Sequence, residues 1–339
     1  MRSAIVLAAA GVVVFGSLAG LGAKDKHLNP MIELHAQKKP IFGLYAPSNP
    51  RGRGNRGAAP GAAGAAAPTA PATPPAAPAV VKTPAELAKD ALAYDKSDFV
   101  FDGTMEGGVD RGIPAFTVLV NALADAAPPA ARWRHPLSVK TPMIAPDPAK
   151  AIDNISRQLN LGVSTIVFVG MESAAEVKQG LAAMRFKSKG GTRPDDVGSA
   201  PKYWGLSDKD YRKKADVWPL NPDGELTNWT IVESKEGLAH VREIVAVKGI
   251  GVLFPGAGTL RGVFSTTGPD GQRKVDTEGW EAAIQQVLAA CKEFNVPCGY
   301  PATENDIETR MKQGFSVFIM NWGDAGFRAI DIGRRVAGR

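Results

Sequence analysis

Reactive side chains are scarce in this chain of 339 residues, which has only two cysteines and four histidines. The spacing of Cys291 and Cys298 matches no zinc or thioredoxin-type pattern. We expect two buried thiols, with a disulfide in an oxidising compartment as the alternative. No histidine follows a predicted strand, and the G-x-S-x-G pattern of a serine nucleophile is missing. Histidine-based and serine-based catalysis are therefore not expected.

Nucleotide-binding fingerprints are also absent. The sequence has no G-x-G-x-x-G after a first strand and no G-x-x-x-x-G-K-[ST], and Gly256-Ala257-Gly258 lacks the rest of either pattern. This absence argues against a doubly wound nucleotide-binding fold.

The net positive charge of the chain arises in its N-terminal part. Residues 1–60 contain eight basic and two acidic side chains, which is the whole formal net charge of +6. A nucleic-acid surface needs Lys and Arg clustered on the folded domain. We therefore expect no nucleic-acid partner.

Long apolar runs are limited to one, at residues 4–23, which follows Arg2 and ends in small residues. This pattern is typical of an export signal, predicted over residues 1–23. We expect a periplasmic or extracellular protein with no stable membrane span after cleavage. An uncleaved N-terminal anchor is the alternative, because the run is long enough to cross a bilayer.

Residues 51–81 consist almost entirely of Ala, Pro, Gly, Arg and Thr. Such a segment buries too little apolar surface to offset its ordering entropy, so we predict a disordered insertion. It separates a first strand, within an N-terminal arm at residues 24–50, from a helix that opens with the capping box Thr83 to Glu86. Residues 82–339 are expected to form the remainder of the same domain.

Strands and helices alternate along the chain, which predicts parallel β-α-β units. Eight such units in about 300 residues fit a closed (β/α)₈ TIM barrel better than an open sheet. The predicted strands cover residues 41–46, 98–102, 141–145, 164–169, 229–233, 251–254, 296–299 and 316–320.

The active site of such a barrel lies at the carboxyl ends of its strands. Asp102, Glu106, Glu172 and Glu233 follow predicted strands, and oxygen ligands of this kind suit Mg²⁺ or Mn²⁺. Glu233 is the strongest candidate, because it ends an apolar run where a charge needs a partner or a metal. For Glu172, stabilisation of the following helix dipole is an equal alternative. Other polar residues after predicted strands are Thr259, Arg261, Asn321 and Asp324.

Several stretches together carry a family resemblance: PIFGLYAPSN, DFVFDG, the block Leu159–Phe186, and VESKEGL. On these stretches the chain resembles the HpcH/HpaI aldolase and citrate lyase family. The resemblance implies a TIM barrel, a homo-oligomer, and a divalent metal that holds pyruvate as an enolate while a carbon–carbon bond is made or broken. Some family members act on acyl-CoA thioesters instead.

The resemblance places Glu233 at the first metal-binding glutamate of the family, and Asp102-Gly103 at the Asp-Gly that opens its catalytic loop. Several other family positions are changed. Thr104 and Met105 stand at the family glutamate and catalytic histidine, Gly258 or Thr259 at the second metal carboxylate, Ala145 at the substrate-binding arginine, and Ile231 at a glutamine.

Methionine cannot transfer a proton and alanine cannot bind a carboxylate, so other residues must compensate. We predict that Glu106 and Arg111, with Asp110 as a further candidate, act from the same loop, and that Glu172 adds a metal ligand. The predicted function is a metal-dependent carbon–carbon lyase acting on a 2-oxo acid or related small acid. The alternative is a non-catalytic exported binding protein. The predicted site comprises Asp102, Glu106 and Arg111 for catalysis, Gly103, Gly256 and Thr259 for substrate binding, and Glu233 and Glu172 for the metal.

Overall fold

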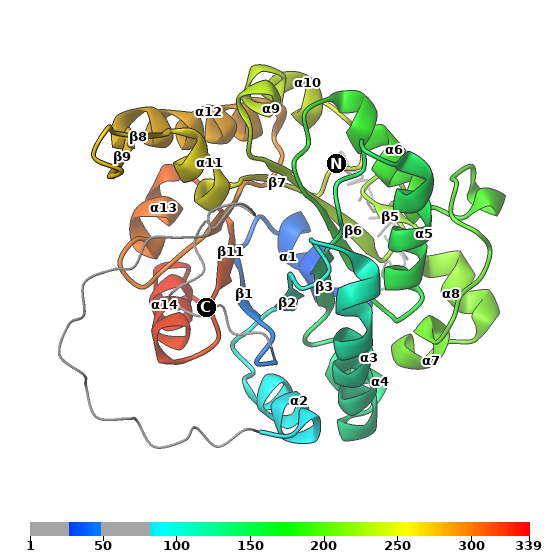
Figure 1. Ribbon diagram of the computed structural model, residues 1–339. Coiled ribbons are helices and arrows are strands. Elements are labelled where there is room, and N and C mark those ends of the chain that lie inside the picture. The colour runs from blue at the N-terminus through cyan, green and yellow to red at the C-terminus, as the bar shows by residue number, and fades with distance from the viewer. Residues whose placement is uncertain (1–26, 49–81) are drawn as a thin grey trace, which may run out of the picture.

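The computed structural model describes residues 27–48 and 82–339 (Figure 1). The predicted export signal at residues 1–23 and the predicted insertion at residues 51–81 lie outside these residues. Within the described ranges, no helix is long and apolar enough to span a membrane.

The described residues form one curled parallel sheet (Figure 1). Its neighbours run in the order β10, β11, β1, β2, β3, β4, β6 and β7. A parallel bridge pairs Leu253 of β7 with Cys298, next to β10, and the Leu253 amide donates to the Pro297 carbonyl at 3.0 Å. The two ends of the sheet therefore meet. The strands are β1 (Ile41–Tyr45), β2 (Val100–Asp102), β3 (Leu137–Lys140), β4 (Thr165–Phe168), β6 (Leu226–Val232), β7 (Val252–Pro255), β10 (Gly299–Pro301) and β11 (Val317–Met320), with a short β5 (Val217–Trp218) beside β6.

Helices surround the sheet, and local sequence explains where several of them begin (Figure 1). The predicted capping box between Thr83 and Glu86 is present at the start of α2, and the Ser173 hydroxyl accepts from an amide in the first turn of α6. The longer helices are α2 (Pro84–Ala93), α3 (Val109–Ala126), α5 (Pro148–Leu159), α6 (Ala174–Met184), α12 (Thr277–Phe294) and α14 (Asp324–Val336). Shorter ones are α4 (Pro129–Arg132), α7 (Ala200–Trp204), α8 (Asp208–Lys214), α9 (Lys235–Ala239), α10 (Val241–Val245), α11 (Ala257–Val263) and α13 (Ile307–Gln313), and a hairpin, β8 (Ser265–Thr267) and β9 (Arg273–Val275), precedes α12.

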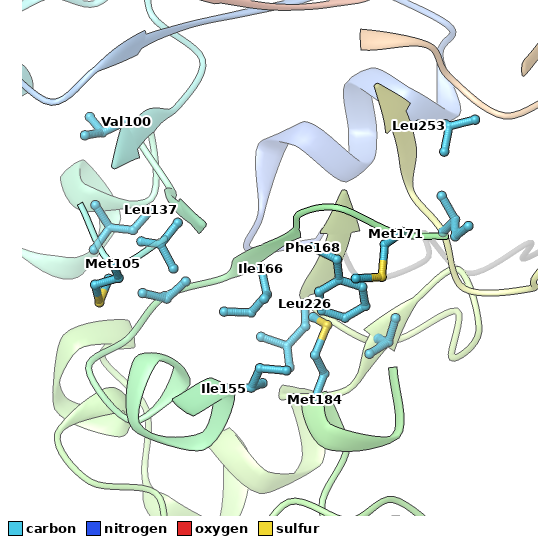
Figure 2. Packing of buried hydrophobic residues seen from close by; sticks show 14 of the residues in the cluster. Val100, Met105, Leu137, Ile155, Ile166, Phe168, Met171, Met184, Leu226 and Leu253 are labelled. Atoms are coloured by element: carbon cyan, nitrogen blue, oxygen red, sulfur yellow. The ribbon is translucent and has the colours of Figure 1, made fainter. Parts of the chain in front are cut away.

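Two hydrophobic cores follow from the alternation of side chains along the strands. The outer core, between sheet and helices, contains Phe42, together with Val100 and Phe168, which Figure 2 shows. The inner core, enclosed by the sheet, contains the other face of each strand. Its buried members are Met31, Ile41, Tyr45, Phe99, Phe101, Val167, Val169, Trp229, Ile231, Val252, Phe254, Val317 and Ile319.

A helix that the sequence analysis did not predict, α1 (Pro30–Ala36), closes one end of the inner core. Met31 belongs to the inner core. The Asn29 amide donates to the Glu225 carboxylate at 3.0 Å, directly before β6, and the His35 ring stacks on Trp218 of β5. Glu225 directly precedes β6, and Trp218 of β5 pairs with Thr227 near the start of β6. The helix α1 therefore covers the end of the sheet where the strands begin.

His35 makes the packing of α1 sensitive to pH. Its Nε2 is buried without a hydrogen-bond partner among the described residues, and burial lowers the pKa of His35 from 6.5 to about 4. Below pH 6.5 the unfolded chain therefore takes up a proton that the folded chain accepts only near pH 4. We expect this contribution to the free energy of unfolding to be complete above pH 6.5 and to decrease as the pH falls towards 4.

A His35→Phe variant keeps a ring against Trp218 but cannot titrate. Urea unfolding of both proteins, measured above pH 6.5 and again near pH 4, should show the larger loss of stability in the natural protein. Equal losses would contradict the assignment of this pH dependence to His35.

The prediction for the third strand was wrong. The sequence analysis placed it at residues 141–145, whereas β3 spans Leu137–Lys140. Pro142 has no amide hydrogen for a sheet ladder, and a proline restricts the residue before it, so the strand ends before this point. The predicted strand at residues 296–299 is also displaced, since β10 spans Gly299–Pro301.

Candidate functional site

The correct end of β3 brings a basic side chain to the candidate site. Leu137 and Val139 face the outer core, so Ser138 and Lys140 take the opposite face of the strand, towards the inside of the curled sheet. Lys140 is therefore the last inward-facing residue of β3. Ala145, predicted at the end of this strand, instead lies exposed in the following loop.

The same alternation identifies the neighbours of Lys140 at the carboxyl ends of the strands. Trp229 and Ile231 are inner-core residues, so Glu233 follows them on the inner face. Gly103 follows Phe101 in the same way, and Gly256 follows Phe254. This set of inward-facing residues, which we call the mouth, comprises Tyr45, Gly103, Lys140, Glu233 and Gly256.

Lys140 is held by close neighbours. Its side chain is 10% exposed, and its ammonium lies 2.9 Å from the Glu106 carboxylate, which is 35% exposed. A Cβ atom on Gly103 would lie 3.8 Å from the Lys140 side chain and 3.7 Å from the Tyr45 ring. The predicted residues Gly103 and Glu106 therefore both lie beside this lysine.

Glu233 lies between two neighbouring strand ends. One carboxylate oxygen accepts from the Gly170 amide at 3.0 Å, in the loop after β4. On the other side Gly256 is so close that a Cβ atom there would lie 2.3 Å from the Glu233 Cβ. The predicted substrate-binding residue Gly256 thus leaves the space that the Glu233 side chain occupies.

Asp102 is almost completely buried at the end of β2. One carboxylate oxygen accepts from the Thr104 amide at 2.7 Å and also from the Thr104 hydroxyl. Burial raises the pKa of the Asp102 carboxyl, although the two bonds from Thr104 oppose this. Because Val100 in the same strand faces the outer core, Asp102 has the parity of the outer face and orders the start of the loop through Thr104.

Met105, which the resemblance alone places at the position of the family histidine, is fully buried in the outer core, near Val100 and Leu137 (Figure 2). The Gln158 side chain donates to its sulfur at 3.6 Å and to the Lys140 carbonyl at 2.8 Å. This position of the loop is therefore turned into the core, away from the mouth.

Restoring histidine at position 105 is expected to cost stability without restoring activity. An imidazole has two ring nitrogens, and the Gln158 side chain that contacts this position can pair with one of them. The other is left buried without a partner, which lowers the free energy of unfolding by about 1–3 kcal/mol. A Met105→Leu control conserves volume and should cost less than about 1.5 kcal/mol. Urea unfolding of the two variants measures the difference, and equal stability would refute the expectation.

The remaining predicted residues lie further from the mouth or on its outer edge. Arg111 and Thr259 are exposed in the first turns of α3 and α11, and the Arg111 guanidinium lies against Gly107. Asp110 is exposed and pairs with Arg157 at 2.6 Å. Glu172 is half-buried before α6, and its amide donates to the Glu176 carboxylate at 3.0 Å.

Of the two predicted metal ligands, Glu233 is the one that faces the mouth. Within residues 27–48 and 82–339, no three His, Cys, Asp or Glu side chains lie close enough together to hold a metal ion. Glu233 supplies one carboxylate to the mouth, and Gly258 and Thr259 add none. The side chains present thus do not form a complete protein-held cation site, and we derive no chemical step through a metal.

The most informative residue that the sequence analysis missed is Lys140. The available signal was Leu137-Ser-Val-Lys140, an alternating run that ends two residues before a proline. Tyr45 was also missed, although it lies one residue before the end of the first predicted strand, and it ends β1 in the structure. Correct placement of the strand ends would have revealed both residues.

A curled parallel sheet inside a layer of helices, with charged side chains at the carboxyl ends of its strands, defines a parallel α/β protein whose site lies at that end. The chain belongs to the HpcH/HpaI aldolase/citrate lyase family, whose profile matches residues 138–330. This confirms the family resemblance of the sequence, and it supports an activity of the carbon–carbon lyase kind.

Known proteins agree with this assignment. The chain is 24% identical over 182 residues to the 5-keto-4-deoxy-D-glucarate aldolase of Salmonella gallinarum (strain 287/91 / NCTC 13346). That match covers 52% of this chain and 63% of the relative. Among solved structures, an HpcH/HpaI aldolase/citrate lyase family protein from Burkholderia cenocepacia J2315 has a TM-score of 0.61 at 18% identity, covering 91% of this chain and 96% of that one. The HpcH/HpaI aldolase of Desulfitobacterium hafniense DCB-2 has a TM-score of 0.57 at 14% identity, covering 91% and 95%. These structures share the fold.

Proposed function

We propose that this protein is a carbon–carbon lyase of the aldolase kind, acting on a 2-oxo acid or a related small acid at the mouth of a closed (β/α)₈ barrel. The observation that carries the proposal is the Lys140–Glu106 pair on the inner rim, 2.9 Å apart. The family resemblance implies a cationic residue at the end of strand three that binds the substrate carboxylate. Without a cation there, this binding would be lost. Lys140 supplies a cation at this strand end.

The mouth provides what such a reaction requires. The Lys140 ammonium attracts the substrate anion, and Gly103 beside it has no side chain that would cover it. Glu106, 2.9 Å from the Lys140 ammonium, supplies a carboxylate that can act as the acid–base group of the reaction. The aromatic and aliphatic inner core below the mouth excludes water from beneath it, which strengthens electrostatic interactions at the rim.

The test is exchange of the methyl protons of pyruvate in D₂O, followed by NMR. The purified protein is assayed with Mg²⁺, with Mn²⁺ and with EDTA, and a Glu233→Ala variant is assayed in parallel. Exchange above the buffer rate supports the proposal. Loss of exchange with EDTA and in Glu233→Ala supports the metal dependence that the family resemblance predicts, whereas exchange that survives EDTA refutes that dependence. No exchange under any condition refutes the action on pyruvate.

A second candidate is a binding protein that captures a small acid without turning it over. It is favoured by Met105, which buries the position of the family histidine in the outer core. Calorimetric binding of pyruvate together with the absence of exchange would establish it. Export and a homo-oligomeric state remain predictions of the sequence and the resemblance, to be checked by fractionation of the native host and by sedimentation.

A further inference from the structure

We propose that a groove in the outer layer of helices binds a medium-chain carboxylic acid, at a site separate from the mouth. The groove lies between α6 and α10, which are neighbours in this layer (Figure 1). Its volume is about 490 Å³, within the range of about 300–1,000 Å³ that is usual for small-molecule sites. None of the mouth residues lines it. The inference is therefore independent of the proposed lyase reaction.

The groove exists because small side chains meet between the two helices. Ala174 and Ala182 of α6 and Ala246 of α10 line it. Neighbouring helix axes lie about 8–10 Å apart, and alanine methyl groups fill little of the space between them. A bulky side chain at one of these positions is therefore expected to fill the groove.

The floor of the groove is apolar. Leu181 of α6 and Val247, just after α10, line it and are buried. Leu220, in the loop after β5, adds a side chain that is 41% exposed. A Cβ atom on Gly249 would lie 3.0 Å from Leu181 and 3.7 Å from Leu220, so the two leucines are close neighbours. An aliphatic chain that covers Leu220 is stabilised by roughly 25 cal/mol for each Å² of apolar surface removed from water.

The rim of the groove is basic. Lys178 and Lys248 line it and make no ion pair or hydrogen bond to the residues that the structure describes. Arg185 also lines it, but its Nε and Nη2 donate to the buried Asp216 carboxylate at 2.7 and 3.2 Å, so its charge is neutralised. The position of Lys248 near the end of α10 agrees with stabilisation of the helix dipole. Lys178 lies in the middle of α6 and has no such role.

The balance of charge selects a ligand with one negative charge. Glu243 of α10 is the single acidic side chain on the lining, and together with the two unpaired lysines it leaves one positive charge unmatched. A carboxylate matches that charge, whereas a phosphate or a dicarboxylate would bring a second negative charge towards Glu243. An ammonium group would add to the positive excess. The apolar floor and the excess cation together fit a carboxylic acid with an aliphatic chain.

The experiment is calorimetric titration of the natural protein with three probes. Octanoate has the chain and the negative charge, octylamine has the same chain with a positive charge, and acetate has the negative charge without the chain. We expect saturable binding of octanoate with one site per chain. Binding of octylamine and of acetate should each be at least about tenfold weaker.

Four variants locate the site. Ala246→Trp fills the groove and should weaken octanoate binding at least about tenfold. Ala289→Trp makes the same change at an exposed position of α12 outside the groove and should bind octanoate like the natural protein. The double variant Lys178→Met and Lys248→Met should weaken binding about fivefold. Lys140→Ala removes the cation of the mouth and should leave octanoate binding unchanged.

Three results would overturn the inference: no saturable binding of octanoate, equal binding of octylamine, or unchanged binding in Ala246→Trp. Loss of octanoate binding in Lys140→Ala would place the acid at the mouth and has the same consequence. The comparison of probes uses the natural protein, so it does not depend on whether a variant folds. The exchange of pyruvate methyl protons tests the proposed function separately.

Discussion

Replacing Glu106 with glutamine is expected to lower the rate of pyruvate methyl exchange by on the order of 10²- to 10⁴-fold, the usual range for loss of a positioned acid–base group. Glutamine keeps the size of the side chain and can still contact the Lys140 nitrogen, but it cannot take a proton. The proposed lyase reaction needs a positioned group that moves a proton to or from the substrate. The loss should therefore appear mainly in kcat and only weakly in KM.

Asp110→Asn is the matched control for Glu106→Gln. Asp110 follows on the same stretch of chain, but it is exposed and pairs with Arg157 on the outside of the sheet. Exchange in Asp110→Asn should stay within a few-fold of the natural rate, because surface ion pairs contribute about 0–1 kcal/mol. Similar losses of exchange in both variants would show that the substitutions disturb the local structure of this segment. Glu106 would then have no special part in proton transfer.

Truncating Trp229 to alanine is expected to produce the largest loss of stability, about 3–5 kcal/mol. The ring is fully buried in the inner core, with its centroid 4.9 Å from that of Phe99 and 5.5 Å from that of Phe254. Phe254 lies on the neighbouring strand β7, and Phe99 directly precedes β2 on another part of the sheet. Because the sheet holds both rings in place, the surrounding structure cannot collapse into the space left behind. Urea unfolding followed by circular dichroism measures the change.

Trp229→Phe is the control for cavity size. The Trp229 ring nitrogen has no hydrogen-bond partner among the described residues, so phenylalanine loses volume but no hydrogen bond. We expect a loss well below that of the alanine variant. A similar loss of stability in the alanine and phenylalanine variants would mean that the shape of the tryptophan ring, and not the volume of the cavity, determines the loss.

The fold could be predicted from the sequence wherever local signals were strong. The capping box at Thr83 and the apolar run of β4 depend on neighbouring residues, and both elements were placed to within about two residues. The helix α1 was missed because its short, partly apolar sequence becomes ordered through distant partners such as Glu225 and Trp218. Residues 187–228, left unassigned by the sequence analysis, contain the short elements α7, α8 and β5.

The candidate site was predictable only in part, for a geometrical reason. A strand shifted by one residue exchanges its inner and outer faces. The prediction of site residues therefore needs the exact register of each strand, whereas the prediction of a helix does not. Glu233 was found because it ends a clear apolar strand. Lys140 was missed because the third strand was placed beyond Pro142, and the burial of Met105 depends on how its loop folds back onto α5.

The position of helix α1 also has a consequence for substrate entry and product release. Since Met31 closes the inner core where the strands begin, we expect reactants to approach Lys140 from the mouth. In a cleavage reaction we expect the 2-oxo acid fragment, attracted by the Lys140 ammonium, to lie deeper and the other fragment to lie towards solvent. Release is then ordered, with the outer fragment leaving first and the 2-oxo acid last. In steady-state kinetics the 2-oxo acid should therefore inhibit competitively against the substrate, whereas the outer fragment should inhibit noncompetitively.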